Sequence, residues 1–186
     1  MAVAFNPVSV EFSVDEDDLA NVNAASFGLN DAALNRASRR ASNKVARWMR
    51  LRVQRFIAGY FKTAQKNIIP RVNVSPADKR GKGAYLWLGT NPIDPTRFYE
   101  PENISAGAMA GGWYFNRGFV ATMPNGKTGI FMRRDKKRLK IDLQKVNIDD
   151  AVREYVSRLI GRAQKQLIKV FHQEINFEMQ KAQGLL

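Results

Sequence analysis

Six cations that recur at helical spacing are the residues best suited to bind a ligand. They are Arg36, Arg39, Arg40, Lys44, Arg47 and Arg50. At about 100° per residue they fall on roughly one third of a helix, and such a face attracts either phosphates or an acidic protein surface. The sequence leaves both partners open. A second basic cluster contains Arg133, Arg134, Lys136, Lys137 and Arg138.

The chain as a whole is strongly basic. Its 30 Lys and Arg residues outnumber 17 Asp and Glu residues and give a formal net charge of +13 over 186 residues. An anionic partner is therefore expected. An acidic run stands out near the N-terminus and consists of Asp15, Glu16, Asp17 and Asp18. This run is either a solvated arm or an assembly arm that docks on the basic face of a neighbour.

Residues that could carry catalysis are scarce. The absence of cysteine excludes disulfides, thiolate metal sites and cysteine nucleophiles. His172 is the only histidine and forms neither a catalytic triad nor a metal site by itself. Asp94, Glu100 and Glu102 lie in a proline-containing segment with no positioned partner, and no glycine-rich segment has the spacing of a nucleotide-binding loop. We predict that the protein is not an enzyme and uses no cofactor or metal.

Aromatic residues of the middle segment allow two interpretations. They are Tyr85, Trp87, Trp113, Tyr114, Phe115, Phe119 and Phe131. Interleaved with arginines, they could form a stacking platform for single-stranded nucleic acid. Their alternation along short segments favours the core of a small sheet.

Two long amphipathic helices must position these groups. The first is predicted over residues 31–67, with Asn30 as its N-cap. Its apolar stripe contains Leu34, Ala41, Val45, Met49, Val53, Phe56 and Tyr60. The last helix is predicted over residues 148–183, between Asn147 and Gly184. Its stripe contains Val152, Tyr155, Val156, Leu159, Ile160, Ala163, Leu167, Val170 and Phe171.

Short strands are predicted between and before the helices. Residues 8–14 alternate between apolar and polar side chains, which is typical of a half-buried strand. Residues 84–146 form a β-rich middle, with strands near 84–89, 111–122 and 141–143 and a hairpin over 117–133 around Asn125-Gly126. Residues 89–110 contain three prolines without periodicity and are predicted to form a long loop.

These elements predict an α+β fold in which a long N-terminal basic helix and a long C-terminal helix pack on a small antiparallel sheet. Residues 1–30 are expected to form a strand and acidic arm, and residues 31–183 a single domain. The first residues lack the basic and apolar regions of a secretory signal, and no segment is apolar enough for a membrane span. The sequence therefore predicts cytoplasmic synthesis and no membrane contact.

The order of the parts resembles a known family. A basic Ala/Arg-rich helix at residues 37–46 is followed by Leu86-Trp87-Leu88-Gly89-Thr90-Asn91, and a glycine-containing hairpin carries Asn125-Gly126-Lys127. A basic turn and the segment 141–146 then lead into the last helix. Over about residues 32–180 this order resembles the minor tail protein Z family of tailed phages.

The resemblance implies a structural virion protein that completes the tail at its head-proximal end and helps join tail to head. It implies work by assembly, as a ring of about six copies, with the tail terminator, tail tube and head–tail connector proteins as neighbours. Its location would be the tail or neck of the virion, after assembly in the host cytoplasm. Exposed cations in a channel that DNA enters would also hold double-stranded DNA without sequence preference. The alternative is a sequence-independent nucleic-acid-binding protein without a virion role.

Overall fold

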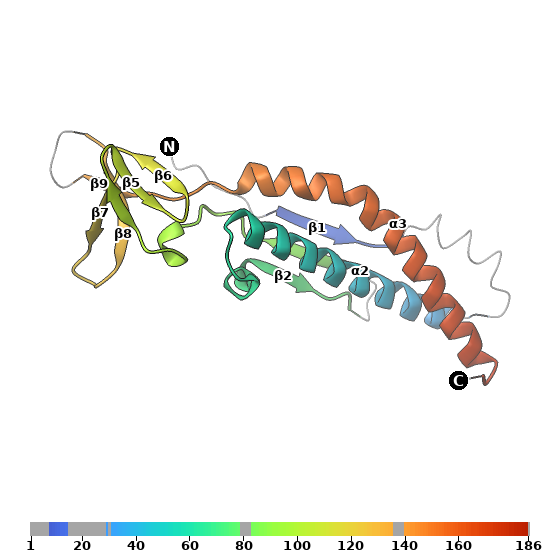
Figure 1. Cartoon of the computed structure of the whole chain (residues 1–186). Helices are drawn as coiled ribbons and strands as arrows, with labels where there is room; N and C mark the ends of the chain where they lie inside the picture. The colour runs from blue at the N-terminus through green and yellow to red at the C-terminus, as the bar shows by residue number, and fades with distance from the viewer. Residues whose placement is uncertain (1–7, 15–28, 30, 79–82, 136–139, 186) are drawn as a thin grey trace.

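The computed structural model describes residues 8–14, 29, 31–78, 83–135 and 140–185. The proposed assembly arm (Asp15, Glu16, Asp17, Asp18), the cap residue Asn30 and the cations Lys136, Lys137 and Arg138 lie outside these residues. The molecule is elongated and has two parts (Figure 1). A body contains both long helices and one small sheet, and a lobe built only of short strands lies at one end.

The first long helix, α2, spans Asp31–Tyr60 and buries small residues together with Met49 and Val53. It ends before the predicted residue 67. Lys62 adopts a left-handed backbone conformation (φ 49°), and the Thr63 amide donates a 2.8 Å hydrogen bond to the Ala58 carbonyl oxygen. This is the geometry of a Schellman cap, here with lysine at the position that glycine usually occupies. Two short 3₁₀ segments follow, η1 (Gln65–Asn67) and η2 (Ile69–Arg71).

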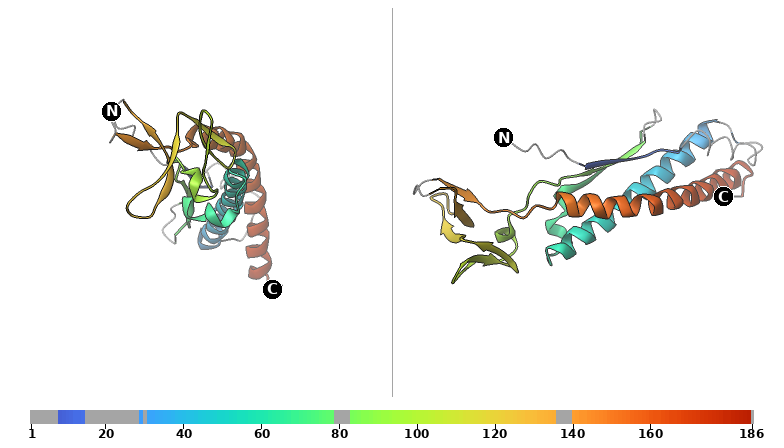
Figure 2. Two further views of the ribbon diagram at one scale, coloured as in Figure 1. Left: turned by 60° about the vertical axis from the view of Figure 1, so that its left-hand side comes forward. Right: turned by 90° about the horizontal axis from the view of Figure 1, so that it is seen from above.

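The last helix, α3, spans Asp149–Ala182, close to its predicted bounds. The N-cap position is Ile148, which makes no side-chain cap, and the side chain of the preceding Asn147 accepts a 3.0 Å hydrogen bond from the Asp149 amide. Helices α2 and α3 lie side by side and run in opposite directions (Figures 1 and 2). The start of α2 and the end of α3 therefore meet at the end of the body that is remote from the lobe.

The body sheet lies against α2. Its strands are β1 (Val8–Phe12), β2 (Val72–Ser75) and β3 (Ala84–Leu88), in the antiparallel order β1-β3-β2. The alternation predicted for residues 8–14 is confirmed, since Phe12 is buried while Ser9 and Glu11 are exposed. Leu86 and Leu88 of β3 point into the same core. Strands β1 and β2 are the two edges of this sheet.

The lobe contains two further antiparallel sheets. One has the order β4-β5-β6 and the other β7-β8-β9. The strands are β4 (Glu102–Ile104), β5 (Gly107–Ala110), β6 (Trp113–Asn116), β7 (Phe119–Thr122), β8 (Thr128–Arg133) and β9 (Ile141–Leu143). The predicted hairpin is confirmed, because β7 pairs with β8 across the Asn125-Gly126 turn. A small core of Ala108, Ala110 and Ile130 joins the two sheets.

Three expectations about the β-rich middle are wrong. Residues 89–110 are not a loop throughout, because they include η3 (Pro95–Arg97) and strands β4 and β5. The strand predicted over 111–122 is broken at Arg117, whose φ is 59°, so that β6 and β7 belong to different sheets. The described residues also form three sheets rather than one. The α+β class is confirmed, but α2 does not begin the chain, since β1 comes before it.

The lobe is fastened to the body by an aromatic junction. The Tyr99 hydroxyl lies 2.5 Å from the Phe61 carbonyl oxygen and 2.8 Å from that of Lys62. It thus donates a hydrogen bond to carbonyl groups at the end of α2 that have no partner within the helix. Gly111 accommodates this arrangement, because a Cβ there would stand 2.0 Å from the Tyr99 ring. Ile93 and Val146 add an antiparallel bridge between the two chain segments that connect body and lobe.

Candidate interaction surface

Half of the predicted basic face of α2 is used inside the molecule. The Arg36 Nη2 and Arg40 Nη1 atoms each lie 2.7 Å from a carboxylate oxygen of Glu178, and Lys44 pairs with Glu174. Arg40 also approaches Glu174 at 3.5 Å. We call these three cations and two glutamates the ionic cluster. Its cations bind α3, and their side chains stay 42%, 34% and 61% exposed, so contact of Arg36, Arg40 and Lys44 with an outside partner stays a prediction.

Burial of the two glutamates explains this use of the cations. The side chain of Glu178 is 1% exposed and that of Glu174 is 7% exposed. A buried carboxylate without a partner is costly, whereas one that accepts charged hydrogen bonds keeps its charge. The hydrogen bond from Arg36 holds the pKa of Glu178 below its ordinary value, with a further contribution from the charge of Arg40.

The other predicted cations of α2 have different surroundings. Arg47 is exposed, whereas Arg39 and Arg50 are half-buried. The Arg50 Nε atom is buried and has no hydrogen-bond partner among the described residues. Arg52, which lies nearer the apolar stripe, stacks over the Trp48 ring at 3.8 Å from its centroid.

The second basic cluster is only partly described. Arg134 forms two hydrogen bonds with Asp142, at 2.7 and 2.9 Å, which lower the pKa of that carboxyl group. Arg133 lies over the Phe119 ring at 5.7 Å. Of this cluster, Arg133 is therefore the described cation that is exposed and has no ion pair with another described residue.

Three cations on α3 were missed by the sequence analysis. Arg162, Lys165 and Lys169 are exposed and make no ion pair with any described residue. Their spacing of three and four residues places them on one side of the helix. We call these residues the α3 basic strip. The spacing rule that identified the α2 cations also applies to these three residues.

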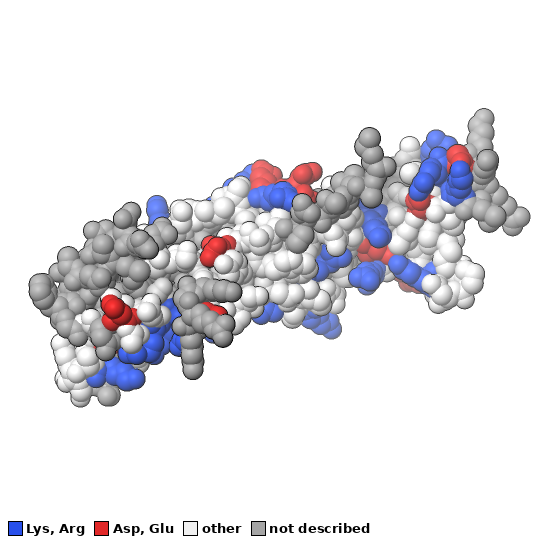
Figure 3. All heavy atoms as spheres, turned by 180° about the vertical axis from the view of Figure 1, so that it is seen from behind, with Lys and Arg blue, Asp and Glu red and all other residues white. Residues whose placement is uncertain are grey.

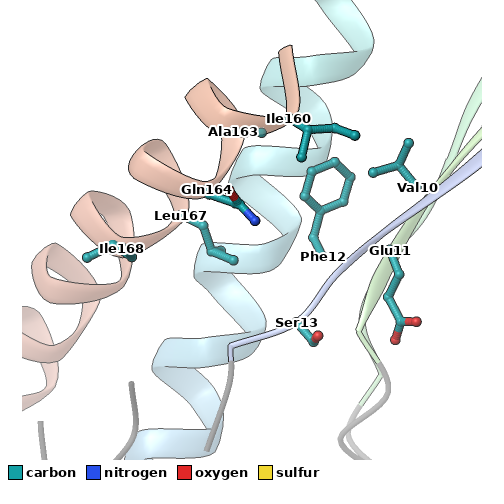
Figure 4. A pocket seen from close by; sticks show the side chains of 9 residues that line it. All are labelled: Val10, Glu11, Phe12, Ser13, Ile160, Ala163, Gln164, Leu167 and Ile168. Carbon is teal, nitrogen blue, oxygen red and sulfur yellow. The ribbon is translucent and has the colours of Figure 1, made fainter. Parts of the chain in front are cut away.

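A groove separates the edge strand β1 from α3 (Figure 4). Its volume is about 380 Å³, and its walls come from residues 10–13 of β1 and its continuation and from residues 160–168 of α3. Ile160 and Ile168 remain 41% and 44% exposed. Apolar side chains are thus left open to solvent beside a strand whose outer edge has no partner strand among those described.

The aromatic residues divide between core and surface. Trp113 and Phe115 pack against the main core, and Phe131 is buried, as the core interpretation predicts. Tyr85, Trp87 and Tyr114 are exposed by 37%, 38% and 50%. From behind, Lys and Arg lie near both ends of the molecule and along the edges of its middle, with uncharged surface between them (Figure 3).

Of the residues considered for catalysis, Asp94 is buried, whereas Glu100, Glu102 and His172 are exposed. His172 is exposed beside Phe171. Asp94 is buried, accepts a 3.0 Å hydrogen bond from the Thr96 amide, and lies 3.2 Å from the Lys127 Nζ atom, which ties the β7–β8 turn to the junction. The described residues contain no group of three or more histidines or acids placed to hold a metal ion. Neither described helix is long and apolar enough to cross a membrane.

No family model, curated protein or solved structure matches this chain. The resemblance to the minor tail protein Z family therefore remains a prediction from the order of the sequence elements.

Proposed function

We propose that the protein is a structural virion component that completes a phage tail at its head-proximal end and helps join tail to head. It acts by oligomeric assembly, with the tail terminator, tail tube and head–tail connector proteins as neighbours. The order of elements on which the resemblance depends supports this proposal. The structural observation that carries it is the outer edge of β1, which pairs with no described strand and lies beside the apolar groove.

Strand β1 is suited to pair with a second copy of the chain. Edge strands present unpaired amide and carbonyl groups, and monomeric proteins commonly protect them with proline, lysine or a bulge. The sequence of β1, Val-Ser-Val-Glu-Phe, contains neither proline nor lysine. A strand from a neighbouring copy could extend the body sheet while its apolar side chains cover Ile160 and Ile168.

The assembly proposal is tested by measuring mass in solution. Light scattering behind a sizing column should show wild-type protein at a discrete multiple of the 21.0 kDa chain as concentration rises. The double variant Ile160→Glu/Ile168→Glu should remain monomeric, because it places charge in the groove. Leu51→Glu is the control, because Leu51 is 48% exposed on α2, away from the groove. This variant should assemble normally. Wild-type protein that stays monomeric at every concentration would contradict assembly through β1.

A sequence-independent nucleic-acid-binding protein without a virion role is the second candidate. The α3 basic strip favours it, because these exposed cations have no ion pair within the described chain. This candidate predicts a monomer whose affinity for nucleic acid falls steeply with salt. Mass measurements without DNA therefore separate the two functions, because only the assembly function predicts a discrete oligomer.

A further inference from the structure

We propose that the α3 basic strip, Arg162, Lys165 and Lys169, binds the phosphate backbone of duplex DNA without recognising its sequence. This goes beyond assembly, because the β1 groove on which the proposed assembly depends uses other residues of α3. It places the DNA contact on other residues than the α2 cations considered first. Arg36, Arg40 and Lys44 are engaged by buried glutamates, whereas the strip is open to solvent.

The length of the strip matches a short run of phosphates. Seven residues of helix separate Arg162 from Lys169, which corresponds to about 10 Å. Duplex DNA carries one phosphate per strand for about every 3.4 Å of its axis, and successive phosphates wind around that axis. A strip of about 10 Å is therefore long enough to reach more than one phosphate.

The neighbouring side chains favour DNA over an acidic protein. Gln173 and Asn176 share this side of α3 with the strip at helical spacing and are exposed. Toward the start of the helix the same side carries Arg158 in an exposed pair with Glu154, and Ile168 borders it as part of the groove. The centres of protein–protein interfaces are depleted in lysine and enriched in aromatic residues, whereas contacts to the DNA backbone are made by Lys, Arg, Asn and Gln.

Gly161 lies one turn before Lys165 and leaves the surface of α3 without a side chain there. A glycine inside a helix costs about 0.5–1 kcal/mol relative to alanine. A Cβ at Gly161 would meet no atom within 4 Å. Steric crowding in the described fold therefore does not require glycine at this position. A bare patch of helix one turn before Lys165 allows a bulky phosphate backbone to approach the strip closely.

The test compares two variants that lose the same charge. Arg162→Gln/Lys165→Gln/Lys169→Gln removes the strip, and Lys62→Gln/Lys66→Gln/Lys181→Gln removes three exposed lysines elsewhere. Fluorescence anisotropy with a labelled duplex of about 30 base pairs is measured between about 50 and 200 mM salt. We expect the strip variant to bind at least tenfold more weakly at low salt and its salt slope to fall by about 2.7, which is 0.9 for each of three phosphates. The control should bind within about threefold of wild type.

A further variant tests the role of the bare patch. Gly161→Leu leaves every charge in place and should raise helicity, yet it should weaken DNA binding several-fold by blocking the approach. Circular dichroism of each variant verifies that the helices remain folded.

Two results would overturn the proposal: wild-type protein that does not bind duplex DNA at low salt, or equal losses in the strip and control variants, since overall charge would then suffice. Failure here is distinct from failure of the assembly function. Solution mass reports on the β1 edge, and anisotropy reports on the strip.

Discussion

The two ends of the α2–α3 pair are held by different forces. At the end remote from the lobe, the ionic cluster joins the helices through Glu174 and Glu178. At the end beside the lobe, Phe56 stacks on Tyr155 with 4.1 Å between ring centroids, and Phe61 packs among neighbouring aromatic rings. One end is thus ionic and the other aromatic, within a single helix pair.

This difference separates stability from alignment. Burial of aromatic rings is favourable and tolerant of small shifts, since it depends mainly on area removed from water. Buried ion pairs return little net free energy, because their attraction is offset by desolvation, but a misplaced partner leaves a buried charge uncompensated. We infer that the aromatic end supplies most of the stability and the ionic end fixes how far one helix slides along the other.

The largest effect is expected from breaking the aromatic end. Phe61→Ala should lower the free energy of unfolding by about 4 kcal/mol, because Phe61 is fully buried and its removal leaves a cavity. Phe177→Ala is the control at the ionic end, where Phe177 is 42% exposed and lies 5.2 Å from the Arg40 guanidinium. It should cost less than about 1 kcal/mol. Urea titration measures both, and similar losses would contradict the division between the ends.

A smaller effect is expected from breaking the ionic end. Glu178→Ala should cost about 2 kcal/mol, since it leaves Arg36 and Arg40 without their closest carboxylate while both cations keep part of their hydration. Glu154→Ala removes a solvent-exposed pair with Arg158 and should cost at most about 0.5 kcal/mol. If the two substitutions had equal effects in thermal unfolding, burial of Glu178 would be irrelevant to the cluster.

The smallest effect is the part of the loss of stability in acid that Glu178 contributes. Because the folded-state pKa of Glu178 is lowered, its stabilising contribution is present above the ordinary glutamate pKa of about 4.3. It is lost as the pH falls through the lower folded-state value. Wild type should therefore lose more stability than Glu178→Gln between about pH 5 and pH 3.

The comparison of wild type with Glu178→Gln removes the contribution of other acids to the loss of stability. The pKa values of Asp142 and Asp149 are also lowered, but both residues titrate in the two proteins alike. Urea midpoints measured across this pH range provide the readout. Parallel pH curves for the two proteins would show that Glu178 does not supply the acid sensitivity.

Much of the body could be predicted from the sequence because its helices are long and periodic. The start of α2, the span of α3 and most of both apolar stripes follow from side-chain spacing, although Tyr60 and Ile160 of these stripes are exposed. The end of α2 could not be predicted, because Lys62 takes the left-handed conformation without a glycine to signal it. Strands β4 and β5 were missed since they are short and contain Gly, Ala and polar residues, so their pairing depends on tertiary contacts.

The candidate site shows a different limit of sequence analysis. The cations of α2 were visible, but their partners lie more than a hundred residues further along the chain. A signal was present in α3, where Glu174 and Glu178 share a side of the helix with the buried Phe171 and Ile175. Acids on an apolar stripe require cations from elsewhere, and only the packing of the two helices shows which cations those are.

The bridge between Ile93 and Val146 has a topological consequence. The chain leaves the body after β3 and returns to it before α3 at neighbouring points, joined by hydrogen bonds of 2.9 and 2.7 Å. In chain order, the lobe is thus an insertion between two consecutive body elements, with its entry and exit side by side. Such an insertion can lengthen, shrink or be exchanged for another module during evolution while the helices and sheet that carry it keep their connections.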